Sequence, residues 1–274
     1  MKNTLDPPLA ATPPDARPRR RPGFAGMLAL GAWLLAGLSL LAYLAAAWNS
    51  DLFARYAPIY LSGLWTTIQL VAISFVVGAL ISVPVALGRG SKGFVQRDLS
   101  TAYVVLFRGT PFIAQLFLIY YGFGQFRDFF ESIGLWRFFR EPWYCAIFAL
   151  ALNTAAYQAE ILRGAVASVP KGQWEGAKSL GLSRLTMLRK VILPQAAVVA
   201  LRPYTNEVIL MVKASAIVAI ITVYDLLGET RRAYSRTFDF QTYLWAAILY
   251  LLIVELLRHA TNFAERRLTR HLRR

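Results

Sequence analysis

The sequence predicts an all-α integral membrane protein with about six transmembrane helices. Hydrophobic residues make up 57% of the 274 positions and charged residues only 16%, against about 25% charged residues in a typical soluble domain. Three long runs lack charge altogether: between Arg21 and Asp51, between Arg55 and Arg89, and between Glu141 and Glu160. Each is long enough for a membrane-spanning helix, which needs about 18 or more apolar residues.

Six apolar runs follow one another along the chain as predicted spans. They are about Phe24–Trp48, Ile59–Leu87, Thr101–Phe126, Trp143–Leu162, Ala196–Val223 and Phe240–Leu257. The run at 24–48 is an extra N-terminal span that precedes a five-helix unit at about 59–268. Residues 1–23 are Pro- and Arg-rich and are predicted to be a disordered cytoplasmic tail, and residues 269–274 a basic C-terminal tail.

The first span has an alternative interpretation as a secretory signal. An arginine cluster precedes the apolar run, and Ala45–Ala47 has the small side chains of a cleavage site. The apolar run exceeds the usual 7–15 residues of a signal, which favours a retained helix. Cleavage would leave the orientation of the other five spans unchanged.

The distribution of lysine and arginine predicts the orientation. With the N-terminus inside, most basic residues fall in inner segments, including the stretch from Arg163 to Lys190, as the positive-inside rule requires. Both termini and the stretch Glu175–Pro194 are then cytoplasmic, in the inner (plasma) membrane. The formal charge of +15 is also typical of nucleic-acid binders. Because the basic residues cluster beside the spans, we expect a lipid membrane and no nucleic acid as partner.

The sequence lacks the residue groups of several enzyme classes. Cys145 is the single cysteine, and the histidines are His259 and His271, so we expect no internal disulfide, no structural metal site and no Cys/His nucleophile pair. No Walker motif occurs in the chain. We therefore expect a protein that is not itself an enzyme and hydrolyses no ATP.

One cytoplasmic segment, Glu175–Pro194, is basic and amphipathic although it lies between two apolar spans. Glu175 is predicted near the positive N-terminal end of a short helix, and Gly181 is predicted to close that helix in the left-handed conformation. Ser183 is placed to cap a second helix. Pro194, which has no N–H, is expected to restart the chain as it re-enters the membrane. This segment, called the elbow below, is thus a helix–break–helix element.

An apolar stripe runs along the elbow at three- to five-residue steps. Its members are Trp174, Ala177, Leu180, Leu185, Leu188 and Ile192. Such a stripe needs something to cover it. Amphipathicity alone leaves lipid headgroups and a protein partner equally open.

Four segments carry ordered motifs at fitting distances. The elbow has Glu175, Ala177, Gly181, Leu193 and Pro194 in the pattern Glu-Ala-Ala, three residues, Gly, nine residues, Ile-x-Leu-Pro, with Gly176 in place of Ala and Val191 in place of Ile. The other three segments are "FRGTPFIAQLFLIYYG" (Phe107–Gly122), "ALNTAAYQAEILRGAVASVPKGQ" (Ala151–Gln173) and "PYTNEVILMVKASA" (Pro203–Ala216). Together they resemble the polar amino-acid family of ABC-importer permeases, closest to its histidine/basic amino-acid and opine branch.

The resemblance implies an ABC type I importer permease fold, with the EAA/coupling loop at about 164–194. It implies that six residues of the elbow mediate docking on cytoplasmic ATPase subunits. They are Glu175, Gly176, Ala177, Gly181, Leu193 and Pro194. A second permease subunit (a homologue or a copy of the chain) and a periplasmic solute-binding protein are the other implied partners. The chain itself would bind no cofactor, since ATP is used by the partner ATPase. The implied function is the permease subunit of an ATP-driven importer of polar amino acids, either basic amino acids, histidine or opines.

Polar residues inside the spans mark a pathway or an interhelical pair. On the fourth span Asn153, Tyr157, Glu160 and Gly164 follow a 4-3-4 spacing and so share one helical face. That face either lines a path for a zwitterionic or cationic solute or forms a hydrogen-bonded seam between helices. The spacing leaves both open.

The fifth span carries Asn206, Glu207 and Lys213 and is expected to be interrupted at Arg202–Pro203. Such an interruption is tolerated where the helix faces protein or a water-filled cavity. Glu207 and Lys213 are six residues apart and do not share a face. They either contact the charged groups of an amino acid or form interhelical ion pairs, and we favour the second.

Arg108 precedes a predicted helix start. Thr110 is expected to cap a helix whose first residue is Pro111, and residues 94–107 then form an interfacial segment. We favour Arg108 as an interfacial anchor at the level of the lipid headgroups over Arg108 as a substrate contact.

The rival function is an ion-gradient-driven secondary transporter for a small polar solute. In it Glu160, Glu207 and Lys213 would relay protons or ions. It predicts ATP-independent uptake by this chain alone.

Overall fold

The computed structural model describes residues 23–46 and 48–268, which form helices and connecting turns with no strand among them. The predicted all-α membrane fold is confirmed, because five of these helices are long and apolar enough to cross a membrane, or six if one bent pair counts as a span. The tails predicted at 1–23 and 269–274 lie outside the described residues, apart from Gly23. The chain divides into two units, Met1–Asp51 and Leu52–Arg274.

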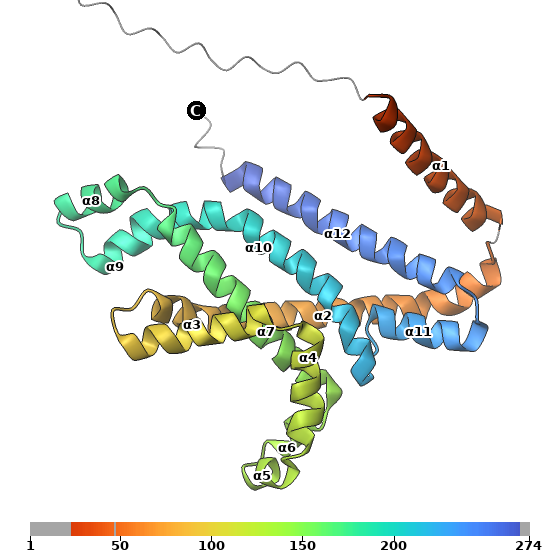
Figure 1. Cartoon of the computed structure of the whole chain (residues 1–274), viewed down its shortest axis with the longest axis horizontal. Coiled ribbons are helices and arrows are strands. Elements are labelled where there is room, and N and C mark those ends of the chain that lie inside the picture. Colours follow the sequence, from red (N-terminus) through yellow and green to blue (C-terminus); the bar gives the residue numbers. More distant parts are fainter. Residues whose placement is uncertain (1–22, 47, 269–274) are drawn as a thin grey trace, which may run out of the picture. The chain divides into compact units, whose positions relative to one another are not determined.

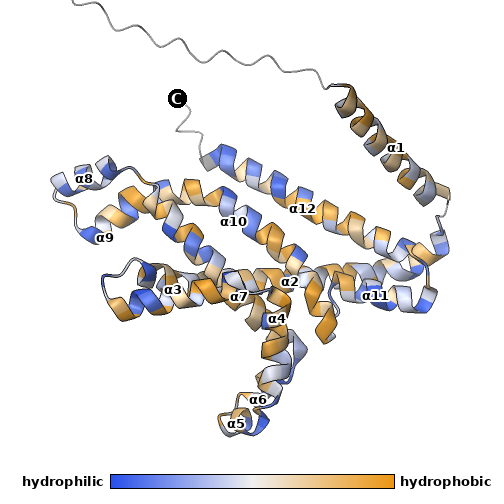
Figure 2. Ribbon diagram, in the orientation of Figure 1, coloured by the Kyte–Doolittle hydropathy of each residue, from blue (hydrophilic) through white to orange (hydrophobic). Residues whose placement is uncertain are grey.

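The first unit contains one described helix, α1 (Phe24–Ala46). Its apolar segment Phe24–Tyr43 has no buried residue, and Figure 2 shows the helix almost entirely in the hydrophobic colours. A helix that is apolar on every side belongs in a protein core or a lipid bilayer. This helix occupies the position of the extra span predicted at 24–48.

Four long helices organise the second unit: α2 (Ser50–Arg89), α7 (Pro142–Ala167), α10 (Leu193–Ser215) and α12 (Gln241–Leu268). As Figure 1 shows, α7 packs against α10 and α3, and α10 packs against α12. Alanines on α7 are almost fully buried, because small side chains let membrane helices approach closely. Gly78 of α2 meets α7 so tightly that an added Cβ would lie 3.1 Å from the carbonyl oxygen of Ala151.

The span predicted at Thr101–Phe126 is not one helix. α3 (Phe94–Gly109) and α4 (Phe112–Phe117), which continues in a π-helical turn at Leu118–Gly122, meet at an angle of 107°. The chain between them is extended at Thr110 and Pro111, since proline disfavours a helical conformation in the residue before it. The prediction that Thr110 caps the second helix is wrong, because its hydroxyl donates to the carbonyl of Leu106 at 2.7 Å.

After the bend, an arm of short helices leads to α7. It comprises α5 (Arg127–Ser132) and α6 (Trp136–Phe139), and its interior is aromatic. Phe123, Phe130 and Phe139 lie with ring centroids 4.7–5.3 Å apart. Such clustered rings give a short segment much apolar contact area, which holds these small helices against the start of α7.

The interruption predicted at Arg202–Pro203 is also wrong, because α10 continues through Pro203 to Ser215. Neighbouring helices can stabilise a membrane helix around a proline, and α7 and α12 flank α10 here. The change comes later, where a 3₁₀ helix at Ala216–Ile221 replaces the α-helix. Thr222 then adopts a left-handed conformation with φ 65°, and the chain turns toward α11.

α11 (Leu226–Thr237) packs between α2 and α12 and begins at a buried carboxylate. Asp225 accepts hydrogen bonds from the Gly228 amide at 2.8 Å and the Tyr250 hydroxyl at 3.3 Å. Burial raises the pKa of Asp225 to about 6. Gly63 of α2 permits the close contact, since an added Cβ there would lie 2.9 Å from the Asp225 carbonyl oxygen.

Candidate functional site

The elbow begins with α8 (Lys171–Ser179), which Gly181 closes. Gly181 has φ +70°, its amide donates to the Lys178 carbonyl at 2.9 Å, and the Leu182 amide donates to the Ala177 carbonyl at 3.2 Å. This pair of bonds is a Schellman motif, which satisfies the last carbonyls of a helix. The left-handed closure predicted at Gly181 is confirmed.

The second half of the elbow is α9 (Arg184–Met187) followed by a π-helical turn at Leu188–Ile192. The predicted cap is confirmed, since the Ser183 hydroxyl oxygen accepts from the Thr186 amide at 3.3 Å. The chain then passes directly into α10. Pro194 lies in the first turn of α10, so the expected restart of the chain there is wrong. A proline is tolerated inside a helical segment where a local π-helical adjustment accompanies it, here at Leu188–Ile192.

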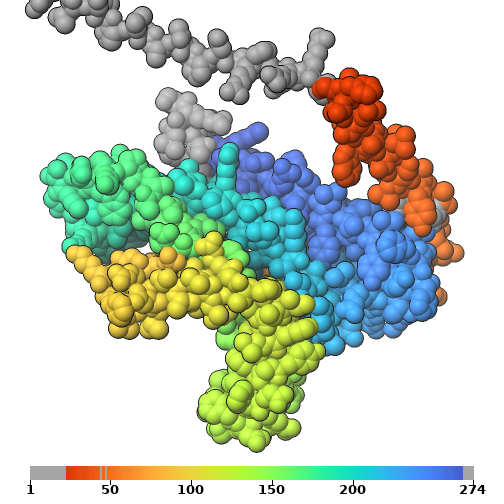
Figure 3. Space-filling model, in the orientation of Figure 1, coloured from red at the N-terminus to blue at the C-terminus, as the bar shows by residue number. Residues whose placement is uncertain are grey.

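The predicted apolar stripe divides into two faces. Ala177 and Ile192 are buried, and Trp174 and Leu188 pack beside them against Ala165 and Ala196 of α7 and α10. Leu180 and Leu185 instead remain 79% and 75% exposed. Leu180 directly precedes Gly181, and Leu185 lies four residues after it. The segment of α8 and α9 forms a surface lobe, green in Figure 3. The elbow thus buries part of its own apolar stripe and leaves Leu180 and Leu185 exposed. These two leucines are called the tip of the elbow below.

The other elbow residues are exposed. Glu175 is the fifth residue of α8 and not in its first turn, so the prediction of a charge at the helix start is wrong by one turn. An added Cβ on Gly176 would meet nothing within 4 Å. Leu193 is half-exposed, and Pro194 is exposed.

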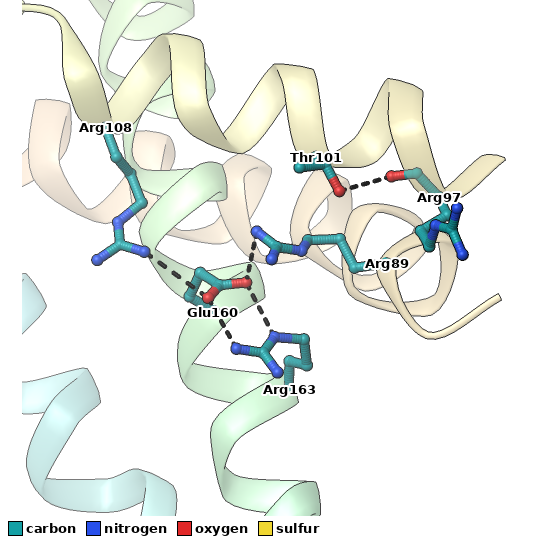
Figure 4. A network of polar contacts seen from close by, with 6 residues as sticks. All are labelled: Arg89, Arg97, Thr101, Arg108, Glu160 and Arg163. Carbon is teal, nitrogen blue, oxygen red and sulfur yellow. Dashed lines mark hydrogen bonds and ion pairs between the residues drawn. The ribbon is translucent and has the colours of Figure 1, made fainter. Parts of the chain in front are cut away.

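Glu160 of α7 is the centre of an ionic cluster, drawn in Figure 4. Arg163 donates to both carboxylate oxygens, at 3.1 and 3.0 Å. The guanidinium of Arg89, the last residue of α2, lies 3.0 Å from one carboxylate oxygen of Glu160. The guanidinium of Arg108 of α3 lies 3.8 Å from the other carboxylate oxygen. Arg89, Arg108, Glu160 and Arg163 are called the Glu160 cluster below. One carboxylate therefore joins three helices.

Tyr157 completes the face predicted on the fourth span. The guanidinium of Arg108 lies over its ring, 5.2 Å from the centroid, a cation–π geometry. Arg108, Tyr157 and Glu160 are therefore neighbours, although their spacing in the sequence does not reveal it. Gly164, the last residue of the predicted face, is exposed and lies outside this group.

Asn153 holds the bend between α3 and α4. Its amide donates to the Phe107 carbonyl at 3.1 Å and to the Gln115 side-chain oxygen at 2.9 Å. Gln115 in turn donates to the carbonyls of Phe107 and Thr110 at 2.9 and 3.1 Å. These bonds satisfy backbone carbonyls that the bend leaves outside any helix, as a membrane interior requires.

A second polar seam lies on the other side of α7. Glu207 of α10 is buried and accepts a hydrogen bond from the Thr154 hydroxyl at 2.8 Å. Gln158 is fully buried and donates to Thr154 at 3.2 Å and to the Phe75 carbonyl of α2 at 3.1 Å. Glu207 therefore has a partner on another helix, and that partner is a hydroxyl.

Lys213 lies apart from Glu207, on an exposed face of α10. Among the described residues no carboxylate lies within 4.0 Å of its ammonium group. The exposed side chains recur at three- and four-residue steps: Val199, Arg202, Asn206, Leu210 and Lys213. Of this set, Arg202 forms a 3.0 Å ion pair with Glu265 of α12. We call this set the α10 outer face.

Pockets occur on both sides of α10, and the described part of the chain has no candidate metal site. A polar pocket of about 190 Å³ between α10 and α12 is lined by Arg202, Asn206 and Arg258, among others. A larger apolar pocket of about 520 Å³ lies between α2, α7 and α10. No group of three His, Cys, Asp or Glu side chains within the described residues is placed to hold a metal ion.

Several of these residues escape sequence reasoning. Arg89 sits at the end of an apolar run and looks like an ordinary positive-inside residue, and Gln115, Thr154 and Gln158 look like isolated polar residues in apolar helices. The available signal is the cost of burying an unpaired polar group, which identifies Gln115 and Gln158 as groups that need partners. It does not identify those partners.

Residues 78–274 match a protein-family model described as "Binding-protein-dependent transport system inner membrane component". The nopaline transport system permease protein NocM of Agrobacterium fabrum is 42% identical over 217 residues, which are 79% of this chain and 90% of that protein. The arginine ABC transporter permease protein ArtM of Escherichia coli is 36% identical over 213 residues, which are 78% of this chain and 96% of that protein.

A solved structure described as an amino acid ABC transporter with histidines matches with a TM-score of 0.71 and 32% sequence identity. The match covers 80% of this chain and 99% of that one. A methionine ABC transporter in an inward-facing conformation shares the fold, with a TM-score of 0.66 and 22% identity. The resemblance drawn from the elbow and the three other motifs is confirmed, and the chain belongs to the family of inner-membrane permease components of binding-protein-dependent ABC transport systems.

Proposed function

We propose that the chain is the membrane-spanning subunit of an ATP-driven importer of polar amino acids or opines. Similarity to permeases for nopaline and arginine supports this substrate class. A partner chain would hydrolyse the ATP, and this chain would bind no cofactor itself. The other partners are a second permease subunit and a periplasmic solute-binding protein. The family description, which names binding-protein-dependent transport, supports the last of these.

The observation that carries the proposal is the exposed tip of the elbow. Leu180 and Leu185 are large apolar side chains, three-quarters exposed, on an otherwise polar surface lobe. Exposed apolar groups rimmed by polar residues mark protein interaction sites. We assign this tip, with Glu175 and Gly176 beside it, to the contact with the ATPase subunit.

The elbow can transmit a movement of the ATPase subunit to the membrane helices. α8 is locked to α9 by the Schellman closure at Gly181 and by the packing of Ala177 against Met187 and Ile192. The helix then runs through Leu193 and Pro194 into α10, so that Arg184–Ile221 is one continuous helical segment. ATP-driven movement of the partner would therefore act on α10, and through the Glu207–Thr154 bond on α7.

The polar residues of the spans take two roles. We assign Asn153, Tyr157, Glu160 and Glu207 to interhelical contacts, because each already bonds or packs against a group of another helix. Asn206 and Lys213 lie exposed on the α10 outer face, and we assign them to the translocation path between two permease subunits. Arg108 serves as an anchor in the Glu160 cluster.

We place the elbow and both termini in the cytoplasm and the arm of α5 and α6 on the periplasmic side. The clustering of basic residues in the inner segments supports this orientation. Exposed Phe126 and Phe129 with Arg127 then lie on the arm, where they are available to the solute-binding protein.

Cross-linking tests the elbow assignment. Cysteine at Leu185, in a chain whose buried Cys145 is replaced by serine, should cross-link to the ATPase subunit in membranes that import normally. A cysteine at Phe129, which is 60% exposed on α5, should not. If the Leu185 cysteine is captured by lipid reagents alone, the elbow does not dock on an ATPase.

The secondary-transport alternative requires carboxylates free to exchange protons. Glu160 is instead bound by Arg163 through two hydrogen bonds, and Glu207 by Thr154. Uptake by proteoliposomes separates the two functions. The complete transporter should take up substrate only with ATP inside. Gradient-driven uptake by this chain alone would establish the alternative.

A further inference from the structure

We propose that the Glu160 cluster, together with α3, binds the phosphate headgroup of an anionic membrane lipid. The ligand chemistry is a phosphate oxyanion, and its source is the cytoplasmic leaflet. This site goes beyond the transport function proposed above, because it needs neither a partner ATPase nor a transported solute.

The cluster carries uncompensated positive charge. Three guanidiniums, of Arg89, Arg108 and Arg163, surround the single carboxylate of Glu160. Among the described residues no other carboxylate lies within 4.0 Å of the three guanidiniums. Because arginine stays charged under all physiological conditions, the cluster itself has a net charge of +2, and the next carboxylate, that of Glu207, acts on Arg108 only from beyond 4.0 Å.

Arg108 also has hydrogen-bonding capacity to spare. A guanidinium offers five N–H donors, and the nearest carboxylate contact of Arg108 is a 3.8 Å approach to Glu160, too long for a hydrogen bond. Its side chain is 43% exposed, and its guanidinium carbon lies 5.2 Å from the centroid of the Tyr157 ring. The donors are therefore accessible to a further acceptor.

The position of the cluster matches the depth of lipid headgroups. Arg89 is the last residue of α2, and Arg163 lies four residues before the end of α7 at Ala167. Both helices are candidate membrane spans. A basic group at the cytoplasmic end of spans lies where anionic headgroups concentrate, and basic pockets between helices at that depth bind such headgroups.

α3 supplies the evidence that lipid is close. Val104 of α3 is buried against the rest of the unit, and the opposite side of the helix is exposed and apolar. That side comprises Val95, Leu99, Ala102 and Leu106, whose four-, seven- and eleven-residue offsets place them on one face. Arg108 is four residues after Val104 and therefore lies on the opposite side of α3 from this apolar face. A helix with one apolar and one cationic side is the arrangement of a helix that lies in the membrane interface.

A phosphate group matches the unused hydrogen-bond donors and the excess positive charge of the Glu160 cluster. Guanidiniums bind phosphate in a bidentate manner, with strong charge-assisted hydrogen bonds. Glu160 holds the three guanidiniums in place and neutralises one of them, so a monoanionic phosphodiester would reduce the remaining charge from two to one.

Binding of phosphatidylglycerol to the purified full-length chain tests the site. Native mass spectrometry, with phosphatidylcholine as the zwitterionic comparison, should detect preferential retention of phosphatidylglycerol. Arg108→Gln and Arg163→Gln should each weaken that retention about fivefold, since an arginine near an anionic leaflet contributes about 1 kcal/mol. Arg97→Gln is the matched control, because Arg97 lies on α3, pairs with Asp98 and points away from Glu160 (Figure 4).

Glu160→Gln gives a prediction of opposite sign. Removing the carboxylate raises the charge of the cluster from two to three and frees the donors of Arg163, so phosphatidylglycerol should bind several-fold more tightly. A purely structural ion-pair cluster would instead loosen and bind no more lipid. If Arg163→Gln does not fold, Arg108→Gln still tests the site, because Arg108 makes no hydrogen bond within the cluster and its loss should not unfold the protein.

Two further outcomes would overturn the proposal. Displacement of the lipid signal by inorganic phosphate at equal concentration would identify a free phosphate as the ligand. Equal retention of phosphatidylglycerol by the wild type, Arg108→Gln and Glu160→Gln would show that the cluster contacts no headgroup. That result is also expected if a second copy of the chain covers α3. Neither result depends on whether the chain imports amino acids.

Discussion

At the scale of single residues, the buried polar groups of α7 determine which helices it holds. The half-buried Asn153 contacts α3, and the half-buried Glu160 contacts both α3 and α2. The buried Thr154 and Gln158 contact α10 and α2. Buried polar groups contribute little when paired but are costly when left alone. Each of these contacts therefore acts mainly by excluding other arrangements of the helices.

The Thr154–Glu207 bond provides a direct test. Thr154→Val keeps the methyl group that packs on Gly78 but removes the hydroxyl, so Glu207 and Gln158 lose a partner. We expect a loss of about 1–3 kcal/mol in the free energy of unfolding, measured from thermal or denaturant unfolding in detergent. Thr154→Ser keeps the hydroxyl and should be the more stable of the two variants. A valine variant as stable as the serine variant would contradict this account of the bond.

Asp225 makes the stability of the protein depend on pH. Its folded pKa of about 6 lies above the usual value of 3.8, so the folded state binds the proton more tightly than the unfolded state. The contribution of Asp225 is therefore greatest at low pH and is lost as the pH rises through 6. Its size is about 3 kcal/mol, at 1.36 kcal/mol per pKa unit.

The neutral variant Asp225→Asn isolates this effect. Asparagine can still cap α11 through its side-chain oxygen but does not titrate. The free energy of unfolding of the wild type minus that of the variant should increase as the pH falls from 7 to 4. Unfolding measured across that range checks the sign, and a difference independent of pH would exclude burial of a titrating carboxyl group at this position.

At the scale of elements, the elbow depends on one backbone conformation. Gly181 and Gly176 both face open space, so an added methyl group would meet no neighbour at either position. Only Gly181 has a positive φ, at +70°. The two glycines therefore form a matched pair that separates backbone strain from steric clash.

Alanine should reduce the coupling of ATP hydrolysis to uptake at Gly181 but not at Gly176. Gly181→Ala places a side chain in the left-handed region, at a cost of about 1–2 kcal/mol, and should reduce solute uptake per ATP hydrolysed in proteoliposomes that contain the complete transporter. Gly176→Ala lies inside α8, where alanine is favoured over glycine by about 1 kcal/mol. It also restores the alanine of the Glu-Ala-Ala pattern at a position of the proposed ATPase contact, so the ratio should not fall. Equal coupling in both variants would count against a rigid elbow.

At the scale of the whole molecule, the sequence predicts faces better than partners. Helical spacing correctly grouped Asn153, Tyr157 and Glu160, because 3.6 residues per turn fixes which side chains share a face. It did not predict that Arg89, 71 positions earlier in the chain, would reach Glu160, since only tertiary packing brings α2 and α7 together. The Gly181 closure was predictable because its cause is local.

The errors have the same origin. Proline at 203 predicted an interruption, but the flanking helices α7 and α12 hold α10 together. Proline at 111 looked like the first residue of a new helix within one span, yet the two helices meet at 107°. That angle is fixed by Gln115 and Asn153, whose partners lie on other segments. Local rules identified the positions of these breaks without giving their geometry.

Two exposed faces of the Leu52–Arg274 unit, on α10 and on α3, should differ in what covers them. The α10 outer face includes Arg202, Asn206 and Lys213, and charged or amide groups of a membrane helix point into a bundle or a water-filled cavity. A second permease subunit should therefore meet this face. The α3 face around Leu106 is wholly apolar and should remain in contact with lipid.

Single cysteines in a chain with Cys145 replaced by serine test this difference. Leu210 and Leu106 are comparable for the purpose, since both are leucines with 46% and 58% of the side chain exposed. In native membranes cysteine at Leu210 should form a cross-link to a permease subunit, whereas cysteine at Leu106 should react only with a lipid-soluble maleimide. Cross-linking at Leu106 with none at Leu210 would reverse the two assignments. It would also remove the lipid-facing surface on which the headgroup site depends, because a protein would then cover the apolar face of α3.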